Sequence, residues 1–454
     1  MQSVFNLKAI SPVDGRYNKI CRRFSDYFSE YGLMKYRVKV EILYFQELCG
    51  ILPELADFNL NRYAPQINDI YNNFSITDAL TIKDIESHIN HDVKSVEYYI
   101  KERLKEILNN DLNVAKYIEF IHYSLTSQDI NNTALPLSIN DCMDDIVFST
   151  IMNLNNKIKE LSKLWIEIPM LSRTHGQPAS PTILGKEFLV FHDRIDKQLN
   201  IMFSVELYAK FGGAVGNFNA HNVSYPEINW CEFADNFIEK FKLKRSQYTT
   251  QIDHYDSIAT LFDNIKRINN ILIDMNRDIW HYISLDYFKL KIIEKEVGSS
   301  AMPHKVNPIN FENSESNLMM ANALLEFFSG KLPISRLQRD LTDSSVCRNI
   351  GVALSHCYIG YYSLLKGLSK LEVNSNKIKC DLADNWVVIS EGIVSILKRH
   401  NYPNPYEKLK ELTRINSKID KIHLIKFINS LEVEPEVKNK LLEITPFNYT
   451  GIIN

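Results

Sequence analysis

The chain has 454 residues, 45% of them hydrophobic, and its formal net charge is −3 at pH 7. This length is too great for one hydrophobic core, because domains mostly span about 50–250 residues. The small charge excludes a global basic field that would attract nucleic acid, so an anionic ligand would have to be held by a local basic cluster.

The compartment is indicated by cysteine usage and by the absence of long apolar runs. The seven cysteines are scattered, odd in number and without a C-x-x-C pair. This pattern argues against a disulfide framework or a zinc site and for a reducing compartment. No apolar run approaches the roughly 18 residues of a membrane span, and residues 1–12 lack the apolar centre of a secretory signal. We therefore expect a cytoplasmic protein.

Residues 1–115 are expected to mix short helices and loops. The segment 11–17 is rich in turn-forming residues, and Arg16 within it could be a solvated turn residue. A helix is predicted roughly from Ser25 to Leu48. Asp92 is expected to cap the start of another helix, whose apolar positions keep helical spacing.

Residues 116–368 are expected to form a helical core. The segment 126–129, Thr-Ser-Gln-Asp, predicts a helix start, because hydroxyl and carboxylate groups cap free N–H groups. The same free donors and the helix dipole could instead bind a carboxylate or a phosphate. Stretches without Gly or Pro predict long helices at 137–168, 186–211, 254–285 and 309–329.

His175 stands among Thr, Gly, Gln and Pro rather than on an apolar helical face. A buried histidine with satisfied hydrogen bonds is the plain alternative, but polar residues on loops tend to be functional. The glycine-rich run at 212–217 lacks the G-K-[ST] ending and the G-x-G-x-x-G spacing of phosphate-binding loops.

The segment 298–308 carries two hydroxyls, an imidazole, an ammonium and a carboxamide. Gly298 frees the backbone, while Pro303 and Pro308 exclude an ordinary helix between them. This segment could be a loop that brings catalytic groups over a substrate, or a surface loop that happens to hold polar residues.

Three arginines, Arg336, Arg339 and Arg348, lie within thirteen residues of each other. They could form a solvated basic patch, offset by Asp340 and Asp343. Alternatively they could bind phosphate or carboxylate, because the guanidinium fork suits both groups.

Three motifs resemble those of the fumarase/aspartase superfamily of lyases. They are TSQD at 126–129, RTHGQ at 173–177 and GSS-x-MP-x-K-x-NP at 298–308, in the superfamily's order. Other segments are similar to the bacterial-type adenylosuccinate lyase family: SPVDGRY at 11–17, NHD at 90–92, YTTQI at 248–252, S-R-x-Q-R-D-L-T-D at 335–343 and His304. The resemblance covers nearly the whole chain.

The resemblance implies an all-α, three-domain fumarase/aspartase-like fold with a central bundle of long helices. The expected domains are residues 1–115, 116–368 and 369–454. The resemblance further implies a homotetramer whose active sites are each built by three subunits, with no cofactor and no metal. The implied reaction is elimination of fumarate from adenylosuccinate, giving AMP, and from SAICAR, giving AICAR, in purine nucleotide biosynthesis.

The resemblance also implies roles for single residues. His175 is the expected general acid, supported by Glu312, and Ser299 is the expected general base. Lys305 and Asn307 are expected to hold the succinyl carboxylates. The nucleotide would be held by Arg16, Tyr17, Arg339, Ser344 and Arg348. Further substrate contacts are expected from Asn90, His91, Asp92, Thr126, Ser127, Gln251, Ser300, Val306, Asn313, Ser345, Val346 and Cys347.

The chain departs from the family pattern at Asn310, where Asp is frequent, and at Ser316, where Gly is frequent. Both lie outside the matched catalytic positions. Two alternatives stay open: a sister lyase such as argininosuccinate lyase, and a non-catalytic structural protein that reuses the fold, as lens crystallins have done. His304 and the SPVDGRY segment argue against the first, and the intact catalytic residues argue against the second.

Overall fold

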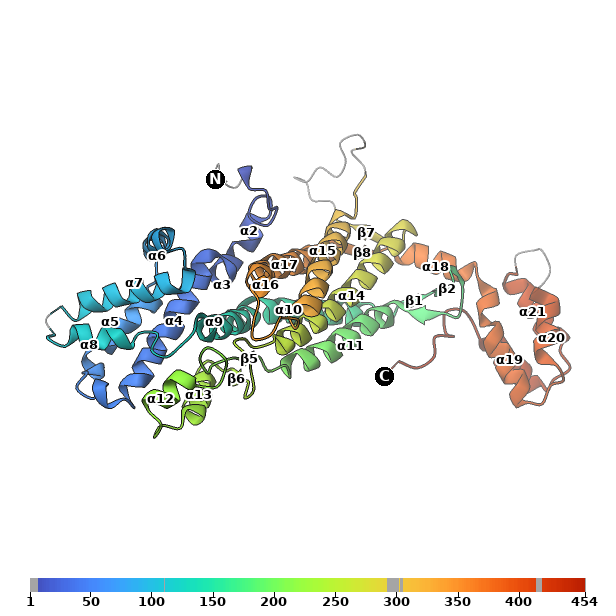
Figure 1. Ribbon diagram of the computed structural model, residues 1–454. Helices are drawn as coiled ribbons and strands as arrows, with labels where there is room; N and C mark the ends of the chain where they lie inside the picture. The colour runs from blue at the N-terminus through green and yellow to red at the C-terminus, as the bar shows by residue number, and fades with distance from the viewer. Residues whose placement is uncertain (1–6, 110, 292–301, 303–304, 414–418, 454) are drawn as a thin grey trace. The chain divides into compact units, whose positions relative to one another are not determined.

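The computed structural model describes residues 7–109, 111–291, 302, 305–413 and 419–453, and α-helices dominate these ranges (Figure 1). The strands in the described part are two or three residues long and pair only two by two. The predicted all-α fold class is therefore confirmed.

The chain divides into two compact units, each assembled from three separate segments. The first comprises Met1–Ile151, Gln198–Asn270 and Ser316–Tyr361, and the second comprises Met152–Lys197, Ile271–Glu315 and Tyr362–Asn454. Several unit boundaries fall inside helices rather than in linkers. The division into domains at 115 and 368 stays a prediction.

The first unit begins with short helices that pack around one long helix, α4. In Figure 1, α4 lies beside α5, α6 and α7, and these helices contact one another. The elements of this region are α2 (Asn18–Cys21), η1 (Arg22–Phe24), α3 (Ser25–Phe28), α4 (Glu30–Cys49), η2 (Pro53–Leu55), α5 (Leu60–Asn72), α6 (Ile76–Ile89), α7 (Asp92–Ile107), α8 (Val114–Tyr117) and η3 (Ile118–Phe120).

The predicted single helix from Ser25 to Leu48 is two helices, because Ser29 interrupts it. The backbone of Ser29 is extended, and its side chain accepts a hydrogen bond from the N–H of Gly32 at 3.1 Å, capping α4. A Cβ at Gly32 would lie 2.8 Å from the backbone of Tyr27. The tight turn between the helices therefore needs both the serine cap and the glycine.

Long helices run through the middle of the chain, where amphipathic stretches predict them. The longest, α14, has 29 residues and matches the predicted range 254–285 closely. At 1.5 Å per residue it is about 44 Å long. The elements are α9 (Ser127–Cys142), the π-helical turn η4 (Met143–Val147), α10 (Phe148–Leu164), α11 (Leu184–Phe203), α14 (Asp256–Ser284), α15 (Ile309–Lys331) and α17 (Ile350–Leu368).

The predicted helix at 186–211 is wrong at its C-terminal end. Helix α11 ends at Phe203, and strand β5 (Tyr208–Ala209) follows it. Strand β5 pairs in parallel with β6 (Lys244–Arg245). The missing signal is non-local, since the partner strand lies more than thirty residues further along the chain.

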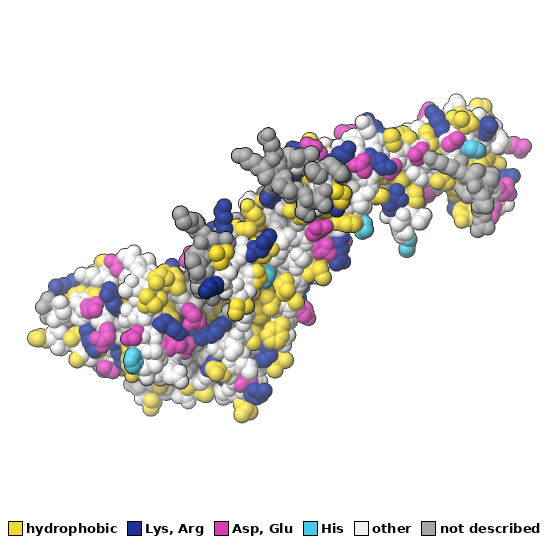
Figure 2. Space-filling model, turned by 90° about the horizontal axis from the view of Figure 1, so that it is seen from above, with side chains coloured by type: hydrophobic (Ala, Val, Ile, Leu, Met, Phe, Trp, Pro, Cys, Tyr) yellow, Lys and Arg dark blue, Asp and Glu magenta, His cyan; other side chains and the backbone are white. Residues whose placement is uncertain are grey.

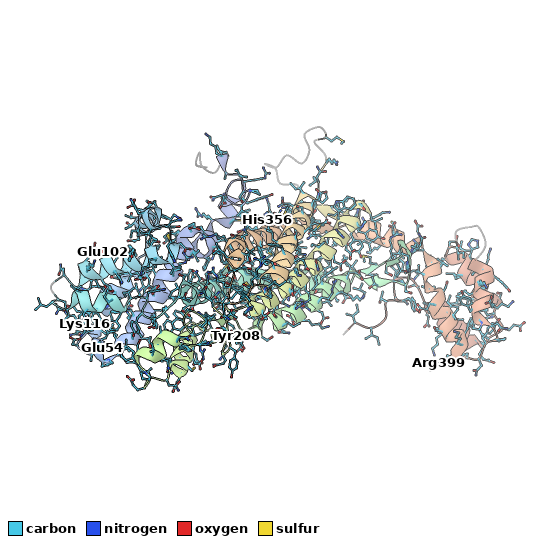
Figure 3. The ribbon with its side chains drawn as sticks, viewed as in Figure 1. Glu54, Glu102, Lys116, Tyr208, His356 and Arg399 are labelled. Atoms are coloured by element: carbon cyan, nitrogen blue, oxygen red, sulfur yellow. The ribbon has the colours of Figure 1, made fainter. Side chains whose placement is uncertain are left out.

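Polar side chains fix contacts between the long helices. Nδ1 of His356 on α17 lies 2.9 Å from Oδ1 of Asn317 on α15 (Figure 3). Asn269 on α14 donates to Oδ1 of Asn322 at 2.9 Å and accepts a hydrogen bond from the hydroxyl of Tyr361 at 2.6 Å. These buried groups are satisfied by one another, so they specify how the helices align.

The remaining elements are short. Helices near the C-terminus of the second unit pack around one cluster of buried aliphatic side chains, including Leu382, Ile393 and Leu441. The elements are β1 (Pro169–Met170), β2 (Arg173–Thr174), β3 (Gln177–Pro178), β4 (Thr182–Ile183), α12 (Asn219–Ser224), α13 (Trp230–Glu239), β7 (Phe288–Leu290), α16 (Thr342–Cys347), β8 (Leu371–Val373), α18 (Ser375–Ala383), η5 (Trp386–Ile389), α19 (Ser390–Arg399), α20 (Pro405–Thr413), α21 (Lys421–Ser430) and α22 (Pro435–Glu443).

The surface mixes charges of both signs with hydrophobic side chains on the face that Figure 2 shows. This distribution agrees with the small net charge of −3. Among the described residues, none of the helices combines the length and the apolar character that crossing a membrane requires.

Candidate active site

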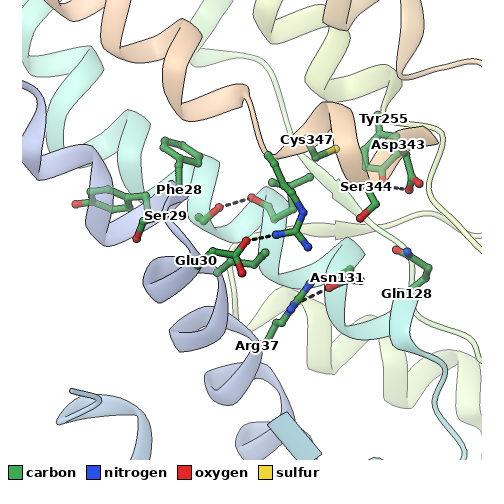
Figure 4. Close-up of a pocket in the computed structure, with 15 residues that line it drawn as sticks. Phe28, Ser29, Glu30, Arg37, Gln128, Asn131, Tyr255, Asp343, Ser344 and Cys347 are labelled. Atoms are coloured by element: carbon green, nitrogen blue, oxygen red, sulfur yellow. Dashed lines mark hydrogen bonds and ion pairs between the residues drawn. The ribbon is translucent and has the colours of Figure 1, made fainter. Parts of the chain in front are cut away.

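A cavity of about 210 Å³ lies in the first unit, between α3, α4, α9 and α16 (Figure 4). Three residues expected to bind substrate line it: Ser344, Cys347 and Arg348. Its lining includes apolar side chains, such as Leu33 and Leu135, and a group of polar and charged ones, here called the polar wall. The other lining residues are Tyr27, Phe28, Ser29, Glu30, Leu33, Arg37, Gln128, Asn131, Leu135, Ser138, Tyr255 and Asp343.

Two arginines and two carboxylates meet at the polar wall. Arg348 pairs with Glu30, and its Nη2 lies 3.5 Å from Oδ2 of Asp92. Arg37 donates from Nη2 to Asp92 at 2.7 Å and from Nε to Asn131 at 2.8 Å. Burial raises the pKa of Asp92, but the charge and hydrogen bond of Arg37 outweigh it and hold that pKa below its usual value.

Arg37 is a site residue that the sequence analysis missed. Its side chain is only 4% exposed, so its charge is buried beside Asp92 and beneath Arg348. The local sequence carries little signal for it, because Arg37 lies between Lys35 and Lys39 in α4, and only the fold shows that its charge is buried and needs a partner.

Arg339 is held near the same wall by the start of α9 and by α16. Its Nη2 lies 3.4 Å from Oδ1 of Asp343, whose Oδ2 accepts a hydrogen bond from the hydroxyl of Tyr255 at 2.9 Å. The amide of Gln128, oriented with its oxygen toward Arg339, accepts from Nε at 3.1 Å. The guanidinium is thus fixed from two sides, as a preorganised anion-binding group should be.

The start of α9 is where the sequence predicts it. Thr126 is the N-cap residue, and its backbone N–H donates to Oδ2 of Asp129 at 2.8 Å. Thr126 and Ser127 are half-buried. The first turn of this helix therefore presents hydroxyls and N–H groups that suit an anion.

Gln251 lies beside the segment that carries Arg339. Its backbone N–H donates to the carbonyl of Gln338 at 3.1 Å, and its side chain donates to the carbonyl of Ala214 at 3.2 Å. Gln251 is half-buried, so its amide is fixed while part of it stays accessible.

The NHD segment is joined to the polar wall through Asp92, which contacts Arg37 and Arg348. Asn90 ends α6 in a left-handed conformation, with φ of 53°. The predicted N-cap is wrong by one residue: His91 caps α7, accepting from the N–H of Lys94 at 3.1 Å, and Asp92 is the first helical residue. This shift frees the carboxylate of Asp92 to bind the two arginines.

Arg16 and Tyr17 lie in a turn before α2. The N–H of Tyr17 donates to the carbonyl of Pro12 at 2.8 Å, and the side chain of Arg16 is exposed. Ser345 is exposed and Val346 is half-buried on α16, beside the lining residues of the cavity.

The second unit carries His175 at the tip of a hairpin. Strands β2 and β3 pair so that Thr174 is opposite Gln177. The two tip residues, His175 and Gly176, have φ of 52° and 74°. A two-residue turn with both φ positive is the tight hairpin turn, and it exposes the imidazole.

The start of α15 carries the other predicted residues of the second unit. Glu312 is exposed and accepts a hydrogen bond from Nε1 of Trp280 at 3.2 Å. Asn313 donates to the hydroxyl of Ser363 at 2.6 Å. Within the described part of one chain, no hydrogen bond or ion pair joins His175 to Glu312.

The segment 298–308, which carries the third lyase motif, is described only at residues 302 and 305–308. Ser299 and Ser300 lie outside the described residues. Lys305 and Val306 are exposed, and Asn307 is half-buried.

A buried ion pair precedes the start of α9. Nδ1 of His122 lies 2.5 Å from Oε1 of Glu41, whose side chain is fully buried. Burial alone lowers the pKa of His122, but the Glu41 carboxylate outweighs it and raises that pKa above its usual value. A raised folded-state pKa adds stability that is complete below the unfolded pKa of about 6.5 and is lost as the pH rises through the folded pKa.

Glu41→Gln is therefore expected to lower the free energy of unfolding by about 1–3 kcal/mol at pH 6 and by less at pH 9. Urea unfolding at both pH values and one protein concentration measures this difference. Glu102→Gln on α7 is the control, because that carboxylate is exposed (Glu102 is labelled in Figure 3) and among the described residues its ion pair is with Lys105. An equal loss at both pH values for Glu41→Gln would exclude the charged pair as its cause.

Comparisons with known proteins agree with these observations. The family described as "Lyase" matches residues 15–324, and the family described as "Adenylosuccinate lyase C-terminal" matches residues 335–450. An adenylosuccinate lyase of Dictyostelium discoideum is 51% identical, over 99% of this chain and 97% of that protein. One from Escherichia coli K12 is 45% identical over 98% of this chain and 97% of that protein.

Solved structures share the fold at low sequence identity. A fumarate lyase from Mesorhizobium sp. BNC1 has a TM-score of 0.72 and 15% identity, covering 95% of both chains. The fold is thus that of the fumarate lyases. With relatives about half identical over nearly their whole length, the chain belongs to the lyase family and, within it, to the adenylosuccinate lyases.

Proposed function

We propose that the protein eliminates fumarate from adenylosuccinate, giving AMP, and from SAICAR, giving AICAR. The observation that carries this proposal is 51% identity to an adenylosuccinate lyase across 99% of the chain. The arginine-lined cavity supports it, because an anionic nucleotide requires a local cationic site on a chain whose net charge is −3.

The chemistry needs a base, an acid and a stabilised intermediate. A base removes a proton from the carbon next to a carboxylate, and an acid protonates the departing nitrogen. The C–H is very weakly acidic, so electrostatic stabilisation of the dianionic intermediate is the largest contribution. Acid and base catalysis each add about 10²–10⁴-fold.

His175 is the proposed acid, with its imidazolium supported by Glu312, and Ser299 is the proposed base. A serine hydroxyl is a poor base, so it needs activation by nearby charge, which Lys305 can supply. Lys305 and Asn307 hold the succinyl carboxylates in this proposal. The exposure of His175 on a tight hairpin supports a role that needs access to a ligand.

Arg339, Ser344 and Arg348 hold the nucleotide in this proposal, together with Arg16 and Tyr17. The cavity supports the first three roles, since Ser344 and Arg348 line it and Arg339 is fixed beside it by Asp343 and Gln128. The other expected contacts are Asn90, His91, Asp92, Thr126, Ser127, Gln251, Ser300, Val306, Asn313, Ser345, Val346 and Cys347.

The proposal includes a homotetramer with shared active sites, in the cytoplasm. Large hydrophobic side chains exposed on the long helices support assembly, because such surface is usually covered by a partner. Examples on α15 are Met319, Met320 and Phe327, each at least 50% exposed. The seven cysteines, all in the described part, are free thiols, which supports a reducing compartment.

The test of function is the ultraviolet absorbance change when purified protein meets adenylosuccinate, with fumarate and AMP identified as products. Argininosuccinate serves as the comparison substrate. Turnover of argininosuccinate alone would assign the sister activity, and turnover of neither would leave the structural alternative.

Arg348→Ala is expected to raise the KM for adenylosuccinate about 10–100-fold with a smaller change in kcat, because it removes charge-assisted hydrogen bonds of about 1.5–3 kcal/mol. Arg336→Ala is the matched control, since its side chain is 78% exposed and pairs only with Asp340 among the described residues. Steady-state kinetics measures both. Equal KM values for the two variants would remove Arg348 from the nucleotide site.

A further inference from the structure

A lysine is fully buried in the first unit. Lys210 follows strand β5, and its side chain is 0% exposed. Its Nζ lies 2.7 Å from Oδ1 of Asp129, which is also 0% exposed. Desolvating two charges costs several kcal/mol per ion, so such a pair persists only with excellent geometry. A well-packed apolar pair often matches the stability of such an ion pair, so stability alone does not account for it.

Asp129 receives four donors from two different loops. Oδ1 accepts from Nζ of Lys210 and from the N–H groups of Gly212 at 2.8 Å and Gly213 at 3.1 Å. Oδ2 accepts from the N–H of Thr126 at 2.8 Å. Lys210 also donates to the carbonyl of Gly213. One buried carboxylate thus joins the start of α9 to the glycine-rich loop at 212–216.

The segment that leads into α9 is strained and held from several sides. His122 and Ser124 both have left-handed backbones, with φ of 60° and 57°. Such residues cost about 1–3 kcal/mol each and persist only where the surroundings fix them. The hydroxyl of Tyr44 donates to the carbonyl of Tyr123 at 2.9 Å, and Gly213 packs against the carbonyl of Ser124. The positions of the Thr126 and Ser127 hydroxyls therefore depend on the glycine-rich loop at 212–216.

The same loop also contacts Gln251, another residue expected to bind substrate. A Cβ at Gly216 would lie 2.4 Å from the hydroxyl of Thr249, so loop and segment 249–251 are in close contact. The carbonyl of Ala214 accepts from the side chain of Gln251 at 3.2 Å. Through Asp129 and the glycine-rich loop, Lys210 is thus connected both to the Thr126–Ser127 helix start and to Gln251, which are expected to bind substrate.

We propose that Lys210 is a positioning residue of the active site. Through Asp129 it holds the Thr126–Ser127 helix start and the loop that orients Gln251 in one arrangement, ready for the anionic substrate. Lys210 does not touch the substrate. This inference rests on the proposed function of the site, because the expected effect of Lys210 is on the binding of adenylosuccinate.

The test compares Lys210→Met with the wild type in adenylosuccinate turnover. Methionine is unbranched and only one heavy atom shorter than lysine, so the substitution keeps most of the side-chain volume and removes the charge. We expect KM to rise about tenfold or more while kcat changes less than about threefold, since misplaced binding groups weaken ground-state and transition-state binding together. A merely structural loss has the opposite signature: fewer folded molecules lower the apparent kcat and leave KM unchanged.

A second variant separates positioning from folding. Asp129→Asn/Lys210→Met removes both charges, so no unpaired charge is left buried and the variant is expected to fold. An amide at position 129 that accepts from Gly212 and Gly213 turns its NH₂ toward the N–H of Thr126, so the link to α9 is broken. Because this link is broken, the double variant should show the same raised KM as Lys210→Met.

Lys101→Met is the control, because Lys101 pairs with Glu97, a carboxylate only 4% exposed, and with Glu119, and no ion pair joins it to a proposed site residue in the part of the chain that the structure describes. Its KM should equal that of the wild type. A KM within twofold of wild type in folded Lys210→Met overturns the inference, as does failure of both Lys210 variants to fold, which makes the pair structural. Absence of turnover in the wild type would instead overturn the proposed function.

Discussion

His175→Ala is expected to lower kcat for adenylosuccinate by about 10²–10⁴-fold and to change KM less than about threefold. The departing nitrogen would leave unprotonated, so the barrier rises only at the transition state. Binding should survive, because the side chain is exposed at a hairpin tip and supports no part of the core. The measurement is steady-state kinetics on a folded variant.

His423→Ala is the control for this experiment. His423 is a half-exposed histidine on α21 that contacts Asp420, and its loss should leave kcat unchanged. If His175→Ala kept near wild-type kcat, another group would have to supply the proton. A variant that lost substrate binding instead would place His175 among the binding residues.

Mixed assemblies of His175→Ala and Ser299→Ala subunits are expected to regain about a quarter of wild-type activity. The expectation follows from a symmetric assembly in which His175 and Ser299 of one site come from different chains. In a random equal mixture, each residue is intact with probability one half at any site. The experiment dissociates the two inactive proteins, reassembles them together and measures turnover.

A double variant, His175→Ala/Ser299→Ala, mixed equally with wild type makes the complementation quantitative. Sites shared between chains again give about a quarter of the activity, whereas sites within one chain give about a half and leave the first mixture inactive. Size measurements confirm that mixed assemblies have formed. The activities of the two mixtures, taken together, distinguish sites shared between chains from sites within one chain.

The helices that were predicted best are those whose bounds are determined by the local sequence pattern alone. The range of α14 differs from the predicted 254–285 by at most two residues at either end, because apolar residues there recur at helical spacing without Gly or Pro. The helix boundaries that were predicted wrongly are set by contacts with other parts of the chain. Ser29 caps a new helix against a close-packed Gly32, and α11 stops at Phe203 because residues beyond it pair with a distant strand.

The site residues that were predicted are likewise those with a local sequence pattern, and those that were missed depend on distant contacts. His175 and the start of α9 were found from local residue patterns, and the structure places them on a hairpin tip and a capped helix. Arg37 and Lys210 were missed, since neither belongs to a local motif: Arg37 lies between Lys35 and Lys39, and Lys210 is a single cation within an apolar run. Their importance depends on a carboxylate elsewhere in the chain, Asp92 and Asp129 respectively, and only the fold reveals these partners.

The interleaving of the two compact units has a consequence for how the chain is made. The first unit needs residues up to 151 and also the segment that ends at Tyr361. During synthesis at about 5–20 residues per second, the intervening stretch of about 210 residues takes roughly 10–40 s to emerge. Until the end of that interval the first unit lacks at least part of its last segment, residues 316–361, so its core stays incomplete. Nascent chains stalled before residue 361 should therefore remain protease-sensitive even though more than two thirds of the protein has been made.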